Sequence, residues 1–135
     1  MKALPAAVLM SAAMALPAHA TEWMDCGDPT QSVSIRVLLG AMDVIAVNTV
    51  EIVANGAKWS TEAGGGATVI TRGQAFETAD QIWIDMTDEQ VNEIIARLRL
   101  FKAMDDGGEE EALPVIGGIL AMPGVGAWAV SCSGP

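Results

Sequence analysis

Histidine and tyrosine are the clearest absences from this sequence. Its 135 residues include no tyrosine and one histidine, His19. Residues 20–135 therefore offer neither a Ser-His-Asp nor a Cys-His catalytic group, and no histidine ligand for zinc, copper or haem. The phosphate-cradling pattern G-x-x-x-x-G-K is also missing, because the glycines at 64–66 are not followed by lysine. The sequence accordingly predicts no catalytic residue, no cofactor and no metal site of these kinds.

The start of the chain has the three parts of a secretory signal peptide. Lys2 provides the positive charge, an apolar run follows, and the small residues of an A-x-A cleavage site end at Ala20. The apolar run is short for a membrane span. We therefore expect residues 1–20 to be removed by cleavage between Ala20 and Thr21, which leaves one small domain over 21–135 that is periplasmic or secreted.

Positive charge is scarce. The chain has 7 lysines and arginines against 17 aspartates and glutamates. Removal of the signal takes away Lys2 and no acidic residue, so the expected mature chain has a formal charge of −11. Nucleic acids and anionic membrane surfaces both require a basic protein surface, so neither is an expected partner. A protein partner is expected instead, and the charge favours a cationic one.

Cysteine occurs only twice, as Cys26 and Cys132. An even count in an exported protein predicts a disulfide, and two cysteines allow one pairing. The bridge would close a loop of about 100 residues and stabilise the fold by roughly 4–5 kcal/mol. Two unpaired buried thiols are the alternative. A redox pair is excluded, because it needs closely spaced cysteines.

Most of the sequence after residue 20 has the pattern of β-strands. Apolar and polar residues alternate over 32–38, with Val33, Ile35 and Val37 on one face. Further strands are expected at 44–47, 67–71, 81–86 and 127–132. We predict a mostly β (α+β) fold, namely a small antiparallel sandwich or barrel-like sheet with one short helix near residues 88–97.

The strongest local prediction is a hairpin over 49–61. Asn55 and Gly56 suit the two central positions of a type I′ turn, which both need φ > 0. That turn pairs Ile52 with Trp59, so that both share one apolar face with Val50. Turn type, register and hydrophobic face all agree on this hairpin.

A helix is expected to begin at Asp88. Thr87 and Gln90 form a capping-box pattern, and apolar residues follow at helical spacing at 91, 94, 95 and 98. The end of the helix is ambiguous, because residues 97–102 also alternate as a strand does. In one interpretation the helix ends near Ala96, a strand runs to Met104, and the chain turns back into 110–116. In the other, the helix itself continues to Met104.

Residues 112–130 carry no charge over a length that could span a membrane. Four glycines and two prolines weaken that interpretation, and no lysine or arginine follows Lys102 to set an orientation. A span here would also separate Cys132 from Cys26. We therefore predict two strands joined at Met122-Pro123-Gly124, and no stable membrane span after the signal is removed.

Two groups of residues are candidate binding sites. The first is the acidic cluster Asp105, Asp106, Glu109, Glu110 and Glu111. Its oxygens suit calcium, but Asp and Gly also belong in a solvated hairpin tip, and EF-hand spacing is missing. The second group is the tryptophans. The strand patterns favour core positions for Trp59 and Trp128. Trp23 lies outside any strand pattern and is the best exposed candidate.

These features favour a small exported non-enzymatic protein that binds a protein of unknown identity or serves as a structural accessory. The layout resembles that of the periplasmic inhibitors of c-type lysozyme: a signal peptide, one early and one late cysteine, and antiparallel β-structure between them. The resemblance implies an inhibitor of a cationic hydrolase, which an acidic protein suits. The Ser-Gly-x-x-Tyr motif of that family is absent, so the resemblance assigns no site residue.

A carboxylate-based hydrolase is a further alternative. Such an enzyme needs two carboxyl groups that face one cleft. Asp80, Asp85 and Asp88 are close in sequence and are the candidates. Asp88 already has a role at the expected start of a helix, which weakens this interpretation.

Overall fold

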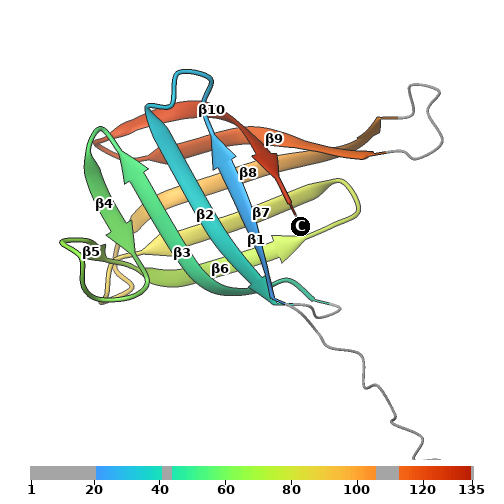
Figure 1. The fold of residues 1–135 in the computed structure, drawn as a ribbon. Coiled ribbons are helices and arrows are strands. Elements are labelled where there is room, and N and C mark those ends of the chain that lie inside the picture. The colour runs from blue at the N-terminus through green and yellow to red at the C-terminus, as the bar shows by residue number, and fades with distance from the viewer. Residues whose placement is uncertain (1–20, 41–43, 106–112, 135) are drawn as a thin grey trace, which may run out of the picture.

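The computed structural model describes residues 21–40, 44–105 and 113–134, which form one sheet of ten strands (Figure 1). The strands are β1 (Glu22–Gly27), β2 (Val33–Gly40), β3 (Ala46–Ala54), β4 (Ala57–Ser60), β5 (Thr68–Val69), β6 (Thr71–Glu77), β7 (Gln81–Thr87), β8 (Ile94–Asp105), β9 (Leu113–Met122) and β10 (Gly126–Ser133). Their order across the sheet is β5-β4-β3-β2-β1-β10-β9-β8-β7-β6. All neighbours pair antiparallel except β4 and β5.

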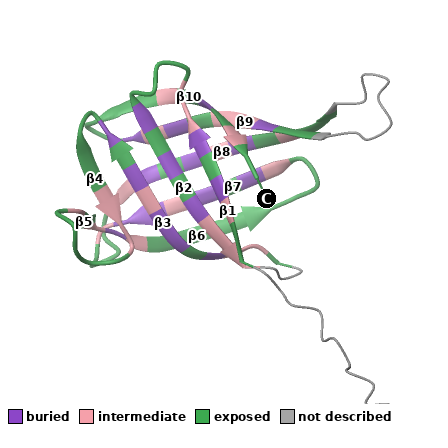
Figure 2. Ribbon diagram, viewed as in Figure 1, coloured by how far each residue is buried: buried purple, intermediate pink, exposed green. Residues whose placement is uncertain are grey.

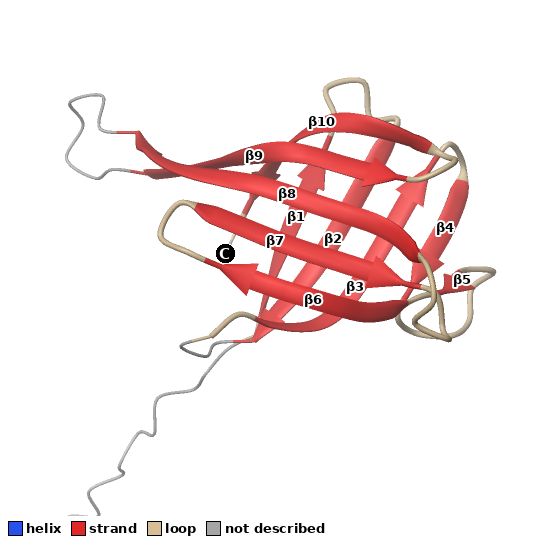
Figure 3. Ribbon diagram, turned by 180° about the vertical axis from the view of Figure 1, so that it is seen from behind, coloured by secondary structure: helices blue, strands red, loops and turns tan. Residues whose placement is uncertain are grey.

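The sheet curls until its two ends almost meet, which gives the barrel-like form, one of the two forms that the sequence leaves open. The guanidinium group of Arg72 in β6 donates a hydrogen bond of 2.6 Å to the carbonyl oxygen of Val47 in β3. Strands β1–β4 form one wall and β6–β9 the opposite wall, as the front and back views show (Figures 1 and 3). The outer surfaces of these two walls therefore face away from each other.

The interior between the two walls is filled with apolar side chains. Buried and exposed residues alternate along most strands (Figure 2). Both walls contribute fully buried residues, among them Met24, Ile35, Val37, Ile52, Ile84, Met86, Leu98, Leu100 and Leu120. The first wall therefore confirms the alternation predicted at 32–38. Burial of each such side chain contributes about 1.5–3 kcal/mol.

The hairpin predicted over 49–61 is confirmed. Strands β3 and β4 pair Ile52 with Trp59 and Ala54 with Ala57. Asn55 and Gly56 have φ values of 51° and 81°, as a type I′ turn requires. Trp59 packs against the core, as the predicted face required.

The helix expected near residues 88–97 is not formed, and that prediction is wrong. The backbone amides of Asn92 and Glu93 donate instead to the Asp88 carboxylate, at 2.7 and 3.4 Å. Val91 has a φ of 59°, which a helix does not allow. Strand β8 begins at Ile94 and runs to Asp105, so alternation prevails over the helical spacing. It prevails because it places Ala96, Leu98 and Leu100 together in the core.

Residues 113–130 of the uncharged stretch form two antiparallel strands, β9 and β10, as predicted. The turn between them is closed by a hydrogen bond of 2.9 Å from the Val125 amide to the Met122 carbonyl oxygen. Gly118 lies where the backbone of β8 approaches β9 closely, so a Cβ atom there would overlap the carbonyl oxygen of Arg99. Within the described ranges, no helix is long and apolar enough to cross a membrane.

The predicted disulfide between Cys26 and Cys132 is present, with Cα atoms 4.0 Å apart. The two cysteines are direct partners in the β1–β10 pairing. The bridge therefore joins β1 of the first wall to β10, the strand that pairs with β9 of the opposite wall. A disulfide is consistent with an oxidising compartment outside the cytoplasm.

Candidate functional site

The residues predicted as binding candidates do not come together. Trp23 lies within β1 rather than outside the strands, and it is only partly exposed. Asp105 is the last residue of β8. Asp106, Glu109, Glu110, Glu111 and Ala20 lie outside the described residues, and Thr21 is exposed just before β1. In the part of the chain that is described, no group of acidic or cysteine side chains is placed to hold a metal ion.

Asp80 and Asp88, two of the three carboxylates considered for hydrolysis, are also separated, and the third, Asp85, pairs with Arg99. Asp80 and Asp88 flank β7 at its opposite ends, about 26 Å apart for an extended strand. The Asp80 carboxylate accepts a hydrogen bond of 2.9 Å from the Thr78 hydroxyl. The Asp88 carboxylate closes the β7–β8 loop. These groups therefore do not share the cleft that a pair of catalytic carboxylates needs.

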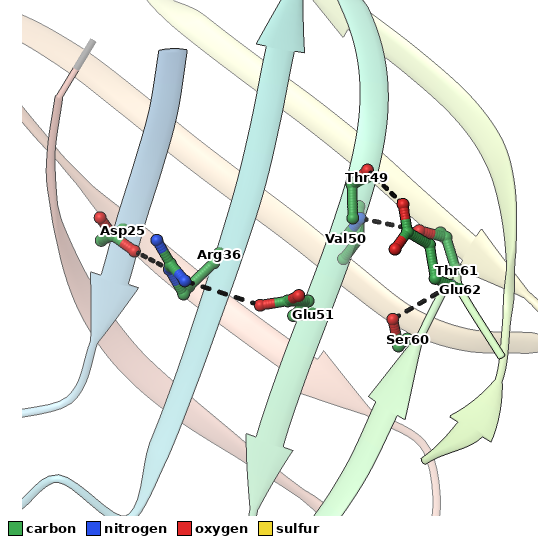
Figure 4. Close-up of polar contacts among 8 residues, drawn as sticks. All are labelled: Asp25, Arg36, Thr49, Val50, Glu51, Ser60, Thr61 and Glu62. Atoms are coloured by element: carbon green, nitrogen blue, oxygen red, sulfur yellow. Dashed lines mark hydrogen bonds and ion pairs between the residues drawn. The ribbon is translucent and has the colours of Figure 1, made fainter. Parts of the chain in front are cut away.

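Because the interior is packed, the outer surfaces of the two walls remain as candidate sites. On the β1–β4 wall, Arg36 lies between two carboxylates (Figure 4). Its Nε is 2.6 Å from Asp25 and its Nη1 is 3.7 Å from Glu51. The Arg36 guanidinium carbon also lies 4.4 Å from the centre of the Trp23 ring. These charged side chains are about half exposed, so their pairing contributes about 0–1 kcal/mol.

The edge of this wall carries a second polar cluster (Figure 4). The Val50 amide donates a hydrogen bond of 3.1 Å to the Thr61 hydroxyl. The Thr49 hydroxyl donates to the Glu62 carboxylate over 3.4 Å, and the Glu62 amide donates to the Ser60 hydroxyl over 3.1 Å. These bonds hold the chain against β3 after β4 ends. We call the outer surface of β1–β4, with Asp25, Arg36 and Glu51 at its centre, the polar face.

The outer surface of the opposite wall is apolar. Five bulky side chains there are about half exposed: Phe76, Trp83, Phe101, Val115 and Ile119, with exposed fractions of 45–62%. We call these five residues the apolar face. They come from β6, β7, β8 and β9, four adjacent strands of one sheet. An exposed apolar surface of this extent is typical of an interaction site.

Strand register places these side chains next to one another. Phe76 is the direct partner of Trp83, with ring centres 6.2 Å apart in an edge-to-face arrangement. Across β8 and β9, Arg99 pairs with Ile119 and Phe101 pairs with Gly117. The aromatic rings are steeply inclined, at 67° between Phe76 and Trp83, so they do not form a flat stacking platform.

Arg99 occupies the middle of the apolar face. Its guanidinium carbon lies 4.8 Å from the centre of the Trp83 ring, and Nη2 lies 2.8 Å from Asp85 Oδ1. The side chains of Arg99 and Asp85 are only 30% and 16% exposed. Asp85 Oδ1 is buried and accepts no well-directed hydrogen bond from the described residues. Its contact with Arg99 is therefore an ion pair without a hydrogen bond. The face thus contains an internally neutralised ion pair.

Small residues continue this surface onto β9 and β10. Ala121 pairs with Ala127, Ile119 with Ala129, and Gly117 with Ser131. Their neighbours Leu120 and Val130 are buried, so these positions point outward. We call Gly117, Ala121, Ala127 and Ala129 the floor, and Phe76, Trp83 and Phe101 the ridge. The two lie side by side on one outer surface.

Two hollows border the two faces. One, of about 270 Å³, lies beside Lys58, Trp59 and the loop at Gly64 and Gly65. The other, of about 260 Å³, lies between Ile45 and Phe76 at the seam of the sheet. Both are smaller than the roughly 300–1,000 Å³ of a ligand pocket. A third hollow, of about 500 Å³, lies at the β9–β10 turn between Ala121 and Ala127, but its lining of small and apolar residues has no polar side chain to orient a ligand. The apolar face is therefore the stronger candidate.

Sequence reasoning missed the apolar face although part of the signal was visible. In the strand pattern at 81–86, Trp83 alternates with Ile82 and Ile84, and the structure shows Trp83 exposed while both isoleucines are buried. Phe101 likewise lies opposite Leu98 and Leu100. Comparison with protein-family models, curated proteins and solved structures found no match to this chain.

Proposed function

We propose that the chain is an exported, non-enzymatic accessory protein that binds another protein chain through its apolar face. The observation that carries this proposal is the half-exposed group Phe76, Trp83, Phe101, Val115 and Ile119 on one wall. The signal-peptide pattern and the disulfide support a role outside the cytoplasm. The absence of histidine and free thiols from the expected mature sequence supports a role in binding rather than catalysis.

The apolar face is large enough to contribute to binding. Its three aromatic side chains alone expose roughly 300 Å², given that such side chains bury about 150–250 Å² each when fully covered. At about 25 cal/mol per Å², covering them is favourable by about 7 kcal/mol before the entropic cost of association. Aromatic side chains in the middle of a patch are also the usual hot spots of interfaces.

A second candidate function is inhibition of a cationic hydrolase. The expected mature charge of −11 favours it, together with the carboxylates of Asp25 and Glu51 on the polar face. Such binding weakens as salt rises, because the attraction is screened over about 10 Å at 0.1 M ionic strength. Binding through the apolar face is far less sensitive to salt.

Site-specific photo-crosslinking in cells tests the main proposal. A photoreactive amino acid replaces Phe101 or Ile119 on the apolar face, and Val53 or Lys58 on the polar face as controls. We expect a protein adduct from both apolar positions and none from the controls. No adduct at Phe101 and Ile119, or the same adducts from all four positions, contradicts the proposal. Adducts only from Val53 and Lys58 would favour the inhibitor.

A further inference from the structure

We infer that the chain bound by the apolar face is a second copy of this protein, docked face to face about a two-fold axis. The inference rests on the proposed function, since it names the partner of the same surface. Its arguments are the shape of the surface, its charge and its area.

The shape of the surface is complementary to itself. In a two-fold interface, the same surface is used by both copies. If residue i of one copy contacts residue j of the other, then residue j of the first copy also contacts residue i of the second. The ridge lies on β6–β8 and the floor on β9 and β10, so a two-fold rotation brings each ridge over the other copy's floor. In this arrangement the two-fold axis runs along the boundary between the ridge and the floor. Ile119 lies at this boundary, next to Arg99, and is therefore near the axis.

The local charge permits two copies to meet here. On the outer surface of β6–β10, the residues whose burial is described include three charged side chains, those of Asp85, Arg97 and Arg99. Asp85 and Arg99 already neutralise each other within one copy. Arg97 is exposed next to them, and Asp105 at the end of β8 has the same position in the alternation, so the surface is close to neutral within an acidic chain. The polar face carries Asp25 and Glu51 but also Arg36 and Lys58, so the bulky apolar side chains, and not the charge, distinguish the two faces.

The area is close to what a dimer needs. Five strands about 4.8 Å apart and about seven residues long cover roughly 550 Å², measured along the curled sheet. A standard interface buries about 800 Å² of accessible surface on each partner, and side-chain relief raises the accessible area of the sheet above this figure. Sheets that pack face to face lie about 10 Å apart, which lets the ridge side chains reach the facing floor.

Salt dependence distinguishes this partner from a cationic one. Two chains of −11 repel each other at long range, and higher ionic strength screens that repulsion. Self-association therefore strengthens as salt rises from about 20 to 200 mM, whereas the binding of a cationic protein weakens.

Sedimentation equilibrium of the disulfide-bonded chain over 21–135 tests the inference. We expect a mass twice that of the chain, with tighter association at higher salt. Ile119→Asp places two like charges near the axis and should weaken association about 100-fold. Ala129→Glu tests the floor and should weaken it as well. Val53→Asp is the matched control, because Val53 is 38% exposed on the polar face, and it should leave association unchanged.

Thermal unfolding shows that each variant is folded before its mass is interpreted. A wild-type chain that stays monomeric at millimolar concentration and 200 mM salt overturns the inference. So does a dimer that Ile119→Asp and Ala129→Glu leave intact while each remains folded. If the wild type is monomeric but Phe101 crosslinks to a different protein, the second copy is excluded and the proposed function stands. If neither occurs, both are wrong.

Discussion

The same arrangement of three side chains occurs in both walls of this protein, in different surroundings. In each wall an arginine stacks on a tryptophan and pairs with an aspartate: Arg36 with Trp23 and Asp25, and Arg99 with Trp83 and Asp85. The first arginine and aspartate are about half exposed, while the second pair is 30% and 16% exposed. The difference comes from the neighbours, which are polar around Arg36 and apolar around Arg99.

This comparison shows that different constraints determine the residues of the interior and those of the outer surface. Both walls bury regular rows of apolar side chains, and both are needed to fill the space between them. Val53 and Trp23 on the polar face are separated by the row of charged residues at Asp25, Arg36 and Glu51, whereas the β6–β9 wall also presents a contiguous group of bulky apolar side chains to the outside. Since the core does not require them there, the apolar face is better explained by contact with another protein chain.

The largest expected effect comes from separating the two walls. Replacing both Cys26 and Cys132 with serine removes the bridge between β1 and β10. The chain-entropy model gives a loss of about 4–5 kcal/mol for a loop of this length. Urea unfolding of the double variant against the oxidised wild type measures it. A loss below about 1 kcal/mol would show that the strand pairing holds the walls together without the bridge.

Equal losses are expected from matched truncations in the two cores. Ile52→Ala in the β1–β4 wall and Leu98→Ala in the β6–β9 wall each remove a fully buried side chain. Each should lower the free energy of unfolding by about 2–5 kcal/mol. Denaturant titration of both variants checks this. A near-zero loss in one wall would mean that the two interiors are not equivalent.

Unequal losses are expected from the two arginines. Arg99→Ala leaves the mostly buried Asp85 without its cation and should cost about 1–3 kcal/mol. Arg36→Ala acts on exposed groups and should cost about 0–1 kcal/mol. Thermal unfolding of the two variants in one buffer provides the comparison. Equal losses would contradict the difference in burial on which the comparison rests.

The smallest effect is expected at Asp28, in the loop between β1 and β2. Hydrogen bonds from the Thr30 hydroxyl and the Val33 amide hold the pKa of the Asp28 carboxyl below its ordinary value of 3.8. A lowered folded-state pKa stabilises the fold above pH 3.8, and this contribution is lost as the pH falls through the folded-state value. An NMR titration of the Asp28 carboxyl carbon tests the direction, and a midpoint at or above 3.8 contradicts it.

Local signals predicted a large part of this fold. The Asn55-Gly56 turn determines the register of β3 and β4, and the alternation at 32–38 and 81–86 identifies β2 and β7. The disulfide followed from having two cysteines in an exported chain. In each case the prediction rested on residues that are neighbours in the sequence, or on the number of cysteines.

The remainder depended on distant contacts. Strand β1 was missed because Trp-Met-Asp-Cys is short and mixed, and its pairing with β10 joins the two ends of the described chain. Most of β6 was missed because a register shift between Arg72 and Ala75 interrupts its alternation. The helix at 88–97 was predicted from spacing that is also compatible with a strand. Only the curl of the sheet determines which side of β8 is inside.

The apolar face was hidden for the same reason. Where both sides of a strand carry apolar residues, as in β9, the sequence does not tell the core side from the outer side. Trp83 and Phe101 were visible as residues opposite a buried row. Their adjacency to Phe76 and Ile119 arises only from pairings across four strands.

The most direct test of the central claim is an isotope-filtered NMR experiment on a mixture of labelled and unlabelled chains. It detects contacts between two molecules and ignores contacts within one. We predict cross-peaks between the ring protons of Trp83 or Phe101 in one copy and the methyl groups of Ala127 or Ala129 in the other. A spectrum without these cross-peaks at concentrations where the chain is dimeric, or with cross-peaks to Val53 in their place, would contradict this account.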